Sequence, residues 1–473
     1  MPHHSSVTAQ IRPAGPTPTA GRALPTTRRW WADAVGSVTG LSMLVVVALW
    51  VSNQGVQNLG DGVWAAARAL GRITGLVSAD LLLIQVLLLA RIPWVERSYG
   101  QDRLARWHRL VGFTSFNLMV AHLVLITLGY AGSVGRFLGE LWDLAVDAPG
   151  MLLAFAGTGM LIMVVVTSIR AARRRLRYES WHLLHLYAYL GVGLALPHQL
   201  WTGTDFVSST PATVYWWTLW GAAAAAIVWY RLGVPALRSA RHQLEVTAVV
   251  AEGPGVTSVH LRGRHLDRLP VRAGQFFNWR FRSGPGWSRA HPYSLSAAPT
   301  DSSLRITVKN LGDDSALVAR LRPGTKVLIE GPYGRLTGES YRGGRITLLG
   351  CGVGITPLRA LLEELPYPHG AATLVYRVRS DADIVFRAEL EAIAAARGVR
   401  VVYVPGRRAD RASWLPATAA HLSDAAALRA IVPDIATNDV YLCGPNAWMD
   451  AATAAATAAG VPARHLHSER FSW

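Results

Sequence analysis

Four histidines within apolar stretches of the chain have the type and spacing to bind metal. His108 and His122 lie fourteen residues apart in one stretch, and His185 and His198 lie thirteen apart in another. Because an α-helix rises about 1.5 Å per residue, each pair is separated by about 20 Å along its helix axis. Histidine is costly in lipid unless it has a partner, so all four are candidates for a function.

The two helices are expected to cross a membrane in the same direction, which pairs the histidines by depth. His108 and His185 then lie near the cytoplasmic side, and His122 and His198 lie at an outer level. One imidazole from each helix at each level predicts two stacked b-type haems, each with two axial histidines and no open iron position, as electron transfer prefers. On an ideal helix His185 and His198 point about 140° apart, and Pro197 can distort the helix there.

Six apolar stretches, each close to the ~20 residues that cross a bilayer, must position these histidines: 33–52, 73–93, 107–130, 150–170, 181–200 and 212–231. Arginines gather in alternate connections. The positive-inside rule therefore predicts an integral protein of the cytoplasmic membrane, in contact with lipid, with both termini in the cytoplasm. His182 is expected at an interface or beside a ligand, and Asp80 is assigned no role.

The composition agrees with a membrane location and excludes some site types. Charged residues make up 16% of the 473 positions, against roughly 25% in an average soluble protein. A net charge of +17 can indicate nucleic-acid binding, but arginines beside membrane spans raise the charge equally well, so no nucleic-acid partner is expected. The two cysteines, Cys351 and Cys443, are too few for a four-cysteine iron–sulfur cluster.

The pattern changes after residue 232 and predicts a multi-domain membrane protein. Residues 1–29, rich in Pro, Thr, Ser and Arg, are expected to be a disordered cytoplasmic tail, and residues 30–232 an all-α, six-span, haem-binding bundle. Short alternating runs over 242–338 predict a small antiparallel β-barrel. Alternating strand and helix patterns over 343–473 predict an α/β domain with a doubly wound parallel sheet.

Residues 289–299, RAHPYSLSAAP, place an aromatic ring beside a hydroxyl group. The Tyr293 ring can stack on an isoalloxazine, and the Ser294 hydroxyl can hydrogen-bond near the flavin N5. The string resembles the flavin-binding signature of ferredoxin–NADP reductase-type modules, in the form found in the ferric reductase and NADPH oxidase superfamily. The resemblance implies that His291, Pro292, Tyr293 and Ser294 bind FAD, whereas an ordinary strand end is the alternative interpretation.

Three more segments resemble the same family. The segment from Lys309 to Ser315 is similar to the one that holds the FAD pyrophosphate, which makes both of these residues candidates for binding FAD. Residues 331–334, GPYG, match the turn that closes the flavin barrel. Family members often end with an aromatic residue over the flavin. Phe471 matches that position, but Trp473 lies beyond it, so the covering ring is left open.

A glycine-rich turn after a predicted strand is expected to bind NAD(P)H through Gly350, Gly352, Gly354, Thr356 and Pro357. Glycines let backbone N–H groups approach a pyrophosphate closely. The turn resembles the NAD(P)H loop of the reductase modules, in which Cys443, Gly444 and Pro445 would complete the nicotinamide site. Hydride transfer is then expected near Ser294, Cys443 and Phe471.

Arginines near predicted strand ends are candidates for the 2′-phosphate that distinguishes NADPH from NADH, because guanidinium groups suit phosphate. Arg377 and Arg379 end one strand, and Arg407 and Arg408 end the next. Surface arginines without a ligand are the alternative interpretation for either pair. NADPH is therefore favoured, with NADH kept as a possibility.

The resemblance as a whole implies a transmembrane oxidoreductase. Electrons would pass from cytoplasmic NAD(P)H through FAD and two b-type haems to an acceptor on the outer face, either oxygen or a ferric chelate, with a protein partner allowed but not required. Two alternatives are kept. The first is a haem-free, membrane-anchored flavin reductase that delivers electrons to a separate protein. The second is a membrane redox sensor without turnover.

Overall fold

The computed structural model describes residues 30–176, 178–408 and 410–470. The chain divides into two compact units, one ending at Val234 and one beginning at Pro235, and each is considered by itself. The expected tail over residues 1–29 and the expected flavin-covering Phe471 lie outside the described residues.

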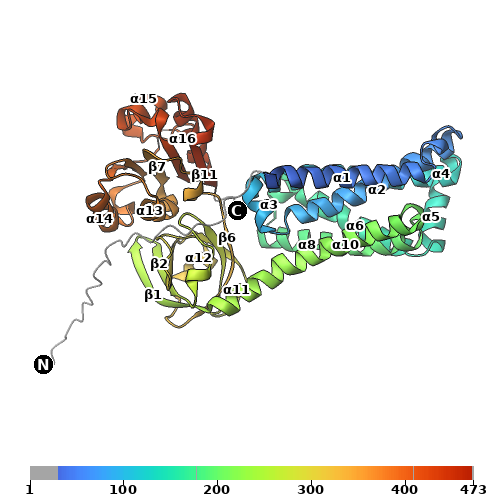
Figure 1. Ribbon diagram of the computed structural model, residues 1–473, viewed down its shortest axis with the longest axis horizontal. Coiled ribbons are helices and arrows are strands. Elements are labelled where there is room, and N and C mark those ends of the chain that lie inside the picture. The colour runs from blue at the N-terminus through green and yellow to red at the C-terminus, as the bar shows by residue number, and fades with distance from the viewer. Residues whose placement is uncertain (1–29, 177, 409, 471–473) are drawn as a thin grey trace. The chain divides into compact units, whose positions relative to one another are not determined.

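The first unit is helical throughout (Figure 1). Its helices are α1 (Trp30–Ser52), α2 (Val63–Leu88), α3 (Pro93–Tyr99), α4 (Gln101–Ala131), α5 (Phe137–Asp147), α6 (Met151–Ser168), α7 (Arg170–Arg173), α8 (Tyr178–Trp201), α9 (Thr204–Val207) and α10 (Thr210–Ile227). A π-helical turn, Val228–Gly233, continues α10 into α11 (Val234–His242).

Four helices are long and apolar enough to cross a membrane: α1, α2, α4 and α6. Little of their apolar surface is covered by protein; in α1 and α4 only 11% of the most apolar segment is buried, as expected for helices that face lipid. Four of the six expected spans are therefore confirmed as helices that could cross a membrane. The remaining two stretches form α8 and α10, but α8 contains His182, His185 and His198, and α10 is rich in Trp, Thr and Ala, so both are less apolar.

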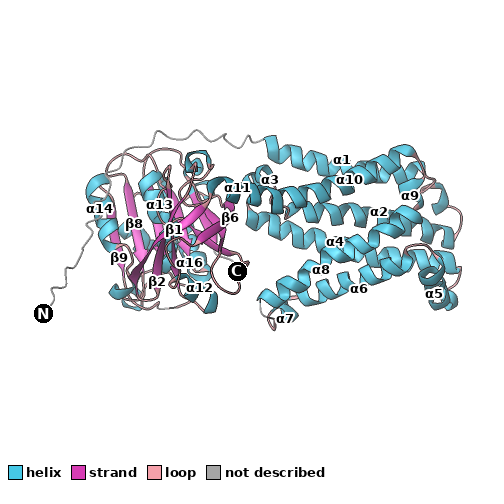
Figure 2. Ribbon diagram, turned by 90° about the horizontal axis from the view of Figure 1, so that it is seen from below, coloured by secondary structure: helices cyan, strands magenta, loops and turns pink. Residues whose placement is uncertain are grey.

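Glycines allow close packing between paired helices of this unit. Figure 2 shows α6 beside α8 and α2 beside α4. A Cβ atom built on Gly157 of α6 would lie 2.5 Å from the Gly191 carbonyl oxygen of α8, and one on Gly191 would lie 3.0 Å from the Gly157 oxygen. Small residues at such positions let helix backbones approach, and packing of this kind holds helices together in lipid.

The second unit begins with a six-stranded antiparallel sheet of order β4-β3-β6-β1-β2-β5. Its strands are β1 (Leu244–Gly253), β2 (Val256–Arg262), β3 (Phe276–Phe281), β4 (His291–Ser294), β5 (Ser303–Lys309) and β6 (Lys326–Tyr333), and α12 (Asp313–Val318) follows β5. Alternate residues of β3 are buried, as the period of a strand requires. Leu295 and Ile306 form an isolated bridge between the two ends of the sheet, while the closed barrel stays a prediction.

A five-stranded parallel sheet of order β11-β10-β7-β8-β9 follows. Its elements are β7 (Ile346–Cys351), α13 (Ile355–Glu364), β8 (Ala372–Arg377), α14 (Arg387–Arg397), β9 (Arg400–Val404), α15 (Asp424–Ile431), β10 (Asp439–Gly444), α16 (Asn446–Ala458) and β11 (Leu466–Arg470). Separate apolar clusters contain Leu358 with Leu390 and Trp414 with Trp448. Helices thus cover both faces of the sheet (Figure 1), as the alternating pattern predicted.

Replacing Gly157 by alanine is expected to destabilise the helical unit by about 1–3 kcal/mol, the usual cost of overpacking, because the added Cβ atom would overlap the Gly191 backbone. Thermal unfolding of the detergent-solubilised protein measures the effect. Gly159→Ala is the matched control in the same helix, since nothing lies within 4 Å of its Cβ position. Equal melting temperatures for the two variants would contradict the packing argument.

Candidate functional site

The inner histidine pair meets between α4 and α8. The ring centroids of His108 and His185 lie 6.0 Å apart, with 61° between the ring planes. An imidazole nitrogen bonds a metal at about 2 Å, so two rings on opposite sides of one metal ion have centroids about 6 Å apart. The pairing predicted from helix rise is present, and the separation fits one shared iron.

The outer pair lines a single cavity. His122 and His198 both face a space of ≈ 350 Å³, a volume within the usual range for ligand sites. Most of its lining is apolar and comes from α2, α4, α5, α6 and α8. Arg72 and Asp205, which the sequence analysis did not single out, line the same cavity and form an ion pair, with Arg72 Nε donating to Asp205 Oδ2 at 2.7 Å.

Three of the four histidines use Nδ1 in the same way. Their Nδ1 atoms lie at hydrogen-bond distance from backbone carbonyl oxygens: His108 from Gln85 (3.0 Å), His122 from Gly71 (2.8 Å) and His198 from Ala195 (2.5 Å). A carbonyl only accepts, so Nδ1 carries the proton and Nε2 keeps its lone pair. This is the usual arrangement of a metal-binding histidine, whose second nitrogen fixes the tautomer and the ring orientation. His185 Nδ1 instead lies 3.3 Å from Ser168 Oγ.

A glycine makes room for His122. A Cβ atom on Gly75 of α2 would lie 2.5 Å from His122 Nδ1, and one on Gly71 would lie 2.8 Å from the Ile126 side chain. The spacing Gly71-x-x-x-Gly75 is a known signal for close helix approach. It could have identified α2 as the neighbour of the histidine helix, but the sequence analysis did not use it.

The other polar residues of the bundle serve different contacts. Asp80 is fully buried and accepts a hydrogen bond from Ser42 Oγ at 2.7 Å, while Ser42 Oγ lies 2.8 Å from Tyr215 Oη. Asp80 therefore connects α1, α2 and α10 and does not line the histidine cavity. Among the described residues, no group of three or more His, Cys, Asp or Glu side chains gathers around a metal position.

The strand formed by the flavin-type string, β4, ends in a buried hydroxyl group. His291, Pro292, Tyr293 and Ser294 form β4, and Ser294 is 5% exposed. Its Oγ atom is buried, and none of the described residues hydrogen-bonds to it. A buried polar atom without a partner costs free energy, so this hydroxyl fits a site whose partner is a bound ligand such as a flavin.

The segment expected to hold the FAD pyrophosphate is ordered by its own serine. Lys309 ends β5 and is half-buried. Ser315 Oγ accepts a hydrogen bond from the Leu311 amide at 2.8 Å and donates one to the Gly312 carbonyl at 3.0 Å. The structure thus uses Ser315 to shape the loop before α12, and its binding to FAD stays a prediction.

The glycine-rich turn lies where the order of the parallel sheet reverses. Strands β7 and β10 are neighbours in the sheet, and both end at the same edge. Ligands of open α/β sheets bind at this point. A Cβ atom on Gly354 would lie 2.3 Å from the Cys443 carbonyl oxygen, and one on Gly444 would lie 2.9 Å from Cys351 Cβ. Only glycine allows the two strand ends to approach this closely.

The same turn has open space beside its backbone at Gly352, where a ligand could approach. Gly352 has a φ of +55°, and nothing lies within 4 Å of its Cβ position. Gly350 packs closely under α13, with its Cβ position 3.1 Å from Leu358. Thr356 and Pro357 are buried in the first turn of α13, and Thr356 Oγ1 donates to the Val353 carbonyl at 2.9 Å. The start of α13 is therefore a suitable place for a diphosphate.

The four candidate arginines have different environments. Arg377 is buried, and its guanidinium donates to the carbonyls of Val404 (3.1 Å) and Trp414 (3.3 Å). Burial lowers its pKa. Arg377 thus holds the chain between β9 and α15, which removes it from the predicted phosphate site.

Arg408 is also engaged, because its Nε atom donates to the Ser413 carbonyl at 2.9 Å. Arg379 and Arg407 are exposed at the carboxyl edge of the sheet. These two arginines are available to a phosphate.

Cys351 is the last residue of β7, directly before the glycine-rich turn. Burial raises the pKa of the Cys351 thiol to about 11, although the positive charges of Arg377, Arg408, Lys309 and Arg379 act in the opposite direction. Burial likewise raises the pKa of Cys443 well above its ordinary value. Both thiols are protonated at neutral pH, and the cations around Cys351 make this edge of the sheet attractive to an anionic dinucleotide.

The C-terminal strand contacts the segment after β6. Glu469 accepts hydrogen bonds from the backbone amides of Arg335 (2.9 Å) and Leu336 (3.3 Å). The strand β11 therefore lies beside the segment that follows β6. Phe471, expected to cover the flavin, lies beyond the described residues.

Two family models match the chain. Residues 74–196 match the "Ferric reductase like transmembrane component", a range that includes His108, His122 and His185 and stops just before His198. Residues 348–454 match the "Oxidoreductase NAD-binding domain", which includes both strand ends of the nucleotide turn. The combination confirms the resemblance to the ferric reductase and NADPH oxidase superfamily.

Curated relatives are similar to about half of the chain. The ferredoxin reductase components of 3-ketosteroid-9-alpha-monooxygenase from Mycolicibacterium smegmatis and Rhodococcus rhodochrous are 33% and 30% identical over 48% of this chain. The matches span 65% and 64% of those relatives, just under two thirds of their length. The solved structure of a cytochrome P450 reductase from Amycolatopsis is 24% identical over 49% of this chain and 69% of that chain, with a TM-score of 0.40.

Alkylation of Cys351 by iodoacetamide is expected to be slow at neutral pH and to accelerate as the pH approaches 11, because the thiolate is the reactive form. Peptide mapping distinguishes Cys351 from the fully buried Cys443, which should react only after unfolding. NADPH should slow the labelling of Cys351 if it occupies the adjacent turn. Rapid labelling of Cys351 at neutral pH would contradict the raised pKa.

Proposed function

We propose that this protein moves electrons from cytoplasmic NAD(P)H through FAD and two b-type haems to an acceptor on the outer face. It is a membrane oxidoreductase that joins a ferric reductase-type transmembrane component to a ferredoxin-reductase-type module. Oxygen, giving superoxide, and ferric iron are the proposed acceptors. The observation that carries the proposal is the double pairing of His108 with His185 and of His122 with His198, in a chain that also matches an oxidoreductase NAD-binding domain.

The side chains of the bundle would hold the haems and fix their ligands. When bound, FAD accepts a hydride and passes on single electrons, and haem iron carries one electron at a time. The hydrogen bonds from His108, His122 and His198 to backbone carbonyls orient the imidazoles before a haem binds. Two histidines per iron leave no open position for a substrate, which suits electron transfer.

The second unit would place the nicotinamide against the flavin. The turn at Gly352 and Gly354 and the first turn of α13 would bind the pyrophosphate through backbone N–H groups. Cys443 and Gly444, at the end of β10, would lie beside the nicotinamide ring. The Ser294 hydroxyl, buried without a protein partner among the described residues, would hydrogen-bond to the flavin that stacks near Tyr293.

We extend the proposal to the membrane topology and the domains. The helices α8 and α10 would be the fifth and sixth spans, because the Gly157–Gly191 contact fixes α8 to α6 and the Asp80–Ser42–Tyr215 contacts fix α10 to α1 and α2. The arginine distribution would place both termini in the cytoplasm. The domains would run over 30–232, 242–338 as a flavin barrel and 343–473.

A second candidate function is a haem-free, membrane-anchored reductase that delivers electrons to a separate protein. It is favoured by the similarity to ferredoxin reductase components of monooxygenases. The two candidates differ in haem content, and they also differ in whether NADPH oxidation on one side of a membrane reduces an acceptor on the other side.

The purified chain is expected to contain two b-type haems and one FAD. His122→Ala or His198→Ala should reduce the haem content to one per chain, because each would remove a residue proposed to hold the outer haem. His182→Ala, in the same helix as His198, should retain both haems. Pyridine haemochrome absorbance and flavin fluorescence measure the stoichiometry. Flavin without haem in the unaltered protein would favour the second candidate function.

Proteoliposomes test the direction of electron flow. NADPH supplied to the nucleotide-binding side is expected to drive superoxide formation or ferric-chelate reduction on the opposite side, and His198→Ala should abolish it. Superoxide dismutase and a ferrous chelator, each confined to one compartment, identify the acceptor. Reduction confined to the NADPH side would contradict transfer across the membrane.

Arg379→Ala and Arg407→Ala are each expected to raise the KM for NADPH about tenfold, or about 1.4 kcal/mol, with little change in the KM for NADH. The reason is that NADH lacks the 2′-phosphate that these exposed guanidinium groups would bind. Steady-state oxidation of both nucleotides with an artificial acceptor measures the effect. Arg345→Ala is the control, since Arg345 pairs with Asp434 at 2.6 Å before the start of β7. Equal losses with NADPH and NADH would exclude the phosphate role.

A further inference from the structure

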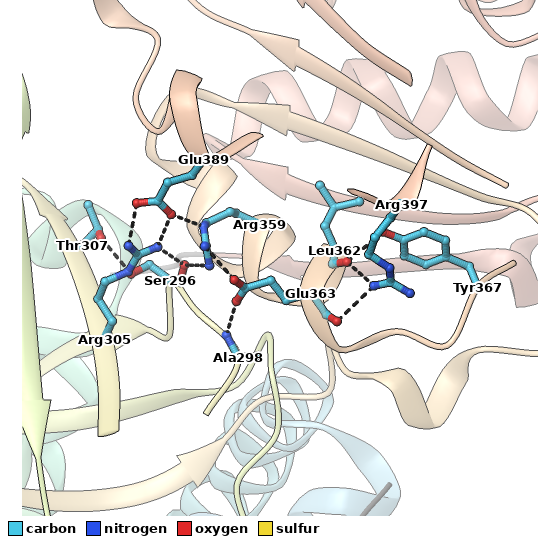
Figure 3. Close-up of polar contacts among 10 residues, drawn as sticks. All are labelled: Ser296, Ala298, Arg305, Thr307, Arg359, Leu362, Glu363, Tyr367, Glu389 and Arg397. Atoms are coloured by element: carbon cyan, nitrogen blue, oxygen red, sulfur yellow. Dashed lines mark hydrogen bonds and ion pairs between the residues drawn. The ribbon is translucent and has the colours of Figure 1, made fainter. Parts of the chain in front are cut away.

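Charged side chains from three elements meet on the backbone segment that follows β4, the proposed flavin strand. The segment is 296–298, two residues beyond Ser294. Around it lie Arg305 of β5, Arg359 and Glu363 of α13, and Glu389 of α14, here called the Glu389 network (Figure 3).

Glu389 is the carboxylate that both arginines share. Arg305 donates through Nη1 to Glu389 Oε1 at 2.8 Å and through Nη2 to Oε2 at 2.9 Å, a bidentate geometry. Arg359 Nε lies 2.6 Å from Glu389 Oε2. Arg359 Nη2 also donates to Glu363 Oε1 at 2.7 Å, so the four charges form one connected set.

The network makes hydrogen bonds directly to the backbone that follows the flavin strand. The Ser296 carbonyl accepts hydrogen bonds from Arg305 Nη2 at 2.8 Å and from Arg359 Nη1 at 3.1 Å. The Ala298 amide donates to Glu363 Oε2 at 2.7 Å. Side chains of the network thus hydrogen-bond to the backbone that follows the flavin strand at both Ser296 and Ala298, as Figure 3 shows.

The two arginines depend on Glu389 because they are almost withdrawn from water. Their side chains are 9% and 8% exposed, against 34% for Glu389. Removing one member of a buried ion pair leaves an uncompensated charge, which costs more than the pair itself contributes. Burial acts to raise the pKa of Glu389, but hydrogen bonds and charges from Arg305 and Arg359 outweigh it and lower the pKa, so the carboxylate is ionised at neutral pH.

The helix that contributes Arg359 and Glu363 also begins at the nucleotide turn. Thr356 lies in the first turn of α13, and Arg359 follows it by three residues. One rigid helix therefore connects the proposed pyrophosphate site to the exit of the proposed flavin strand. A displacement of this helix relative to β4 would change the distance between the two reacting rings.

We propose that Glu389 is a positioning residue for hydride transfer: by holding Arg305 and Arg359 on the Ser296 carbonyl, it sets how closely the nucleotide turn approaches the flavin strand. This inference rests on the proposed binding of FAD and NAD(P)H to this unit. In the step that it positions, NAD(P)H loses a hydride, which is two electrons and one proton, and the flavin gains it. Glu389 itself neither gains nor loses a proton or an electron.

The variant Glu389→Gln keeps the size of the side chain and removes its charge. The expected result is a decrease of about tenfold to a hundredfold in the rate of flavin reduction in a single anaerobic turnover, because a misplacement of about 1 Å can cost about a hundredfold in rate. FAD content and the Kd for NADPH should change by less than about twofold, since no proposed ligand of either cofactor is altered. Glu389→Asp, which retains a carboxylate, should recover part of the rate.

A second measurement does not depend on cofactor turnover. Hydrogen exchange at the amides of the 296–298 segment, followed in the full chain without added nucleotide, should accelerate in Glu389→Gln. Without the Glu389 carboxylate, Arg359 would no longer be held in place to fix Glu363, which is the acceptor of the Ala298 amide. Glu363→Gln, which changes the carboxylate that itself accepts the Ala298 hydrogen bond, provides an independent variant if Glu389→Gln does not fold. It should accelerate exchange and slow flavin reduction in the same direction.

Asp434→Asn is the matched control, because it removes the carboxylate of an exposed ion pair with Arg345 in the same domain. It should leave both readouts unchanged. An unchanged single-turnover rate in Glu389→Gln, or a loss explained entirely by weaker NADPH binding or lower FAD content, would overturn the inference. If neither nucleotide reduces flavin in the unaltered protein, the proposed function fails and the positioning role fails with it. If hydrogen exchange and flavin reduction are both unchanged in Glu389→Gln, only the positioning role is refuted.

Discussion

Withdrawing a polar atom from water costs free energy unless a hydrogen bond replaces the one lost, and both units are organised around this cost. In the helical unit, three candidate ligand histidines direct Nδ1 to backbone carbonyls, and Asp80 bonds to Ser42. In the second unit, the almost buried Arg305 and Arg359 share one carboxylate. Buried polar atoms that lack a partner among the described residues include the hydroxyl of Ser294, which is where a flavin is proposed to bind.

Close backbone approach is the second requirement that the two units share. Gly75 admits the ring of His122, and Gly354 admits the Cys443 carbonyl; in both places a Cβ atom would lie within about 2.5 Å of its neighbour. A methyl group at either position would displace a proposed ligand or separate the two ends of the nucleotide turn. At both positions glycine is needed because it has no Cβ atom, and the neighbouring group occupies the space that a Cβ atom would fill.

Helix rise made the depth pairing of the histidines predictable, because the distance along a helix depends only on residue number. The ring separation of His108 and His185 was not predictable, since it depends on how α4 and α8 are rotated. The strand–helix alternation similarly predicted the parallel sheet, but it did not predict which of the candidate arginines would be buried. Arg377 is buried because the chain between β9 and α15 folds over it, a tertiary contact that spacing does not encode.

Hydropathy was a weaker guide where function altered composition. The helix α8 contains three histidines, and the residues that suggest a haem site are the same residues that make the helix less apolar than its neighbours. Ser315 was selected by resemblance, and the structure shows that its hydroxyl first orders its own loop. The Glu389 network was not anticipated, because Arg305, Glu389 and the Arg359–Glu363 pair lie far apart in the sequence and each alone has the appearance of a surface charge.

The order of the parallel sheet has a consequence for how the chain matures. Strand β7 (Ile346–Cys351) pairs with β10 (Asp439–Gly444), although about ninety residues separate them, and two other strands are made in between. Contacts between distant segments form slowly during folding. During synthesis, the helical unit and the antiparallel sheet emerge well before the nucleotide turn acquires its second half. The ability to accept electrons from a dinucleotide would therefore be the last to appear in a newly made chain.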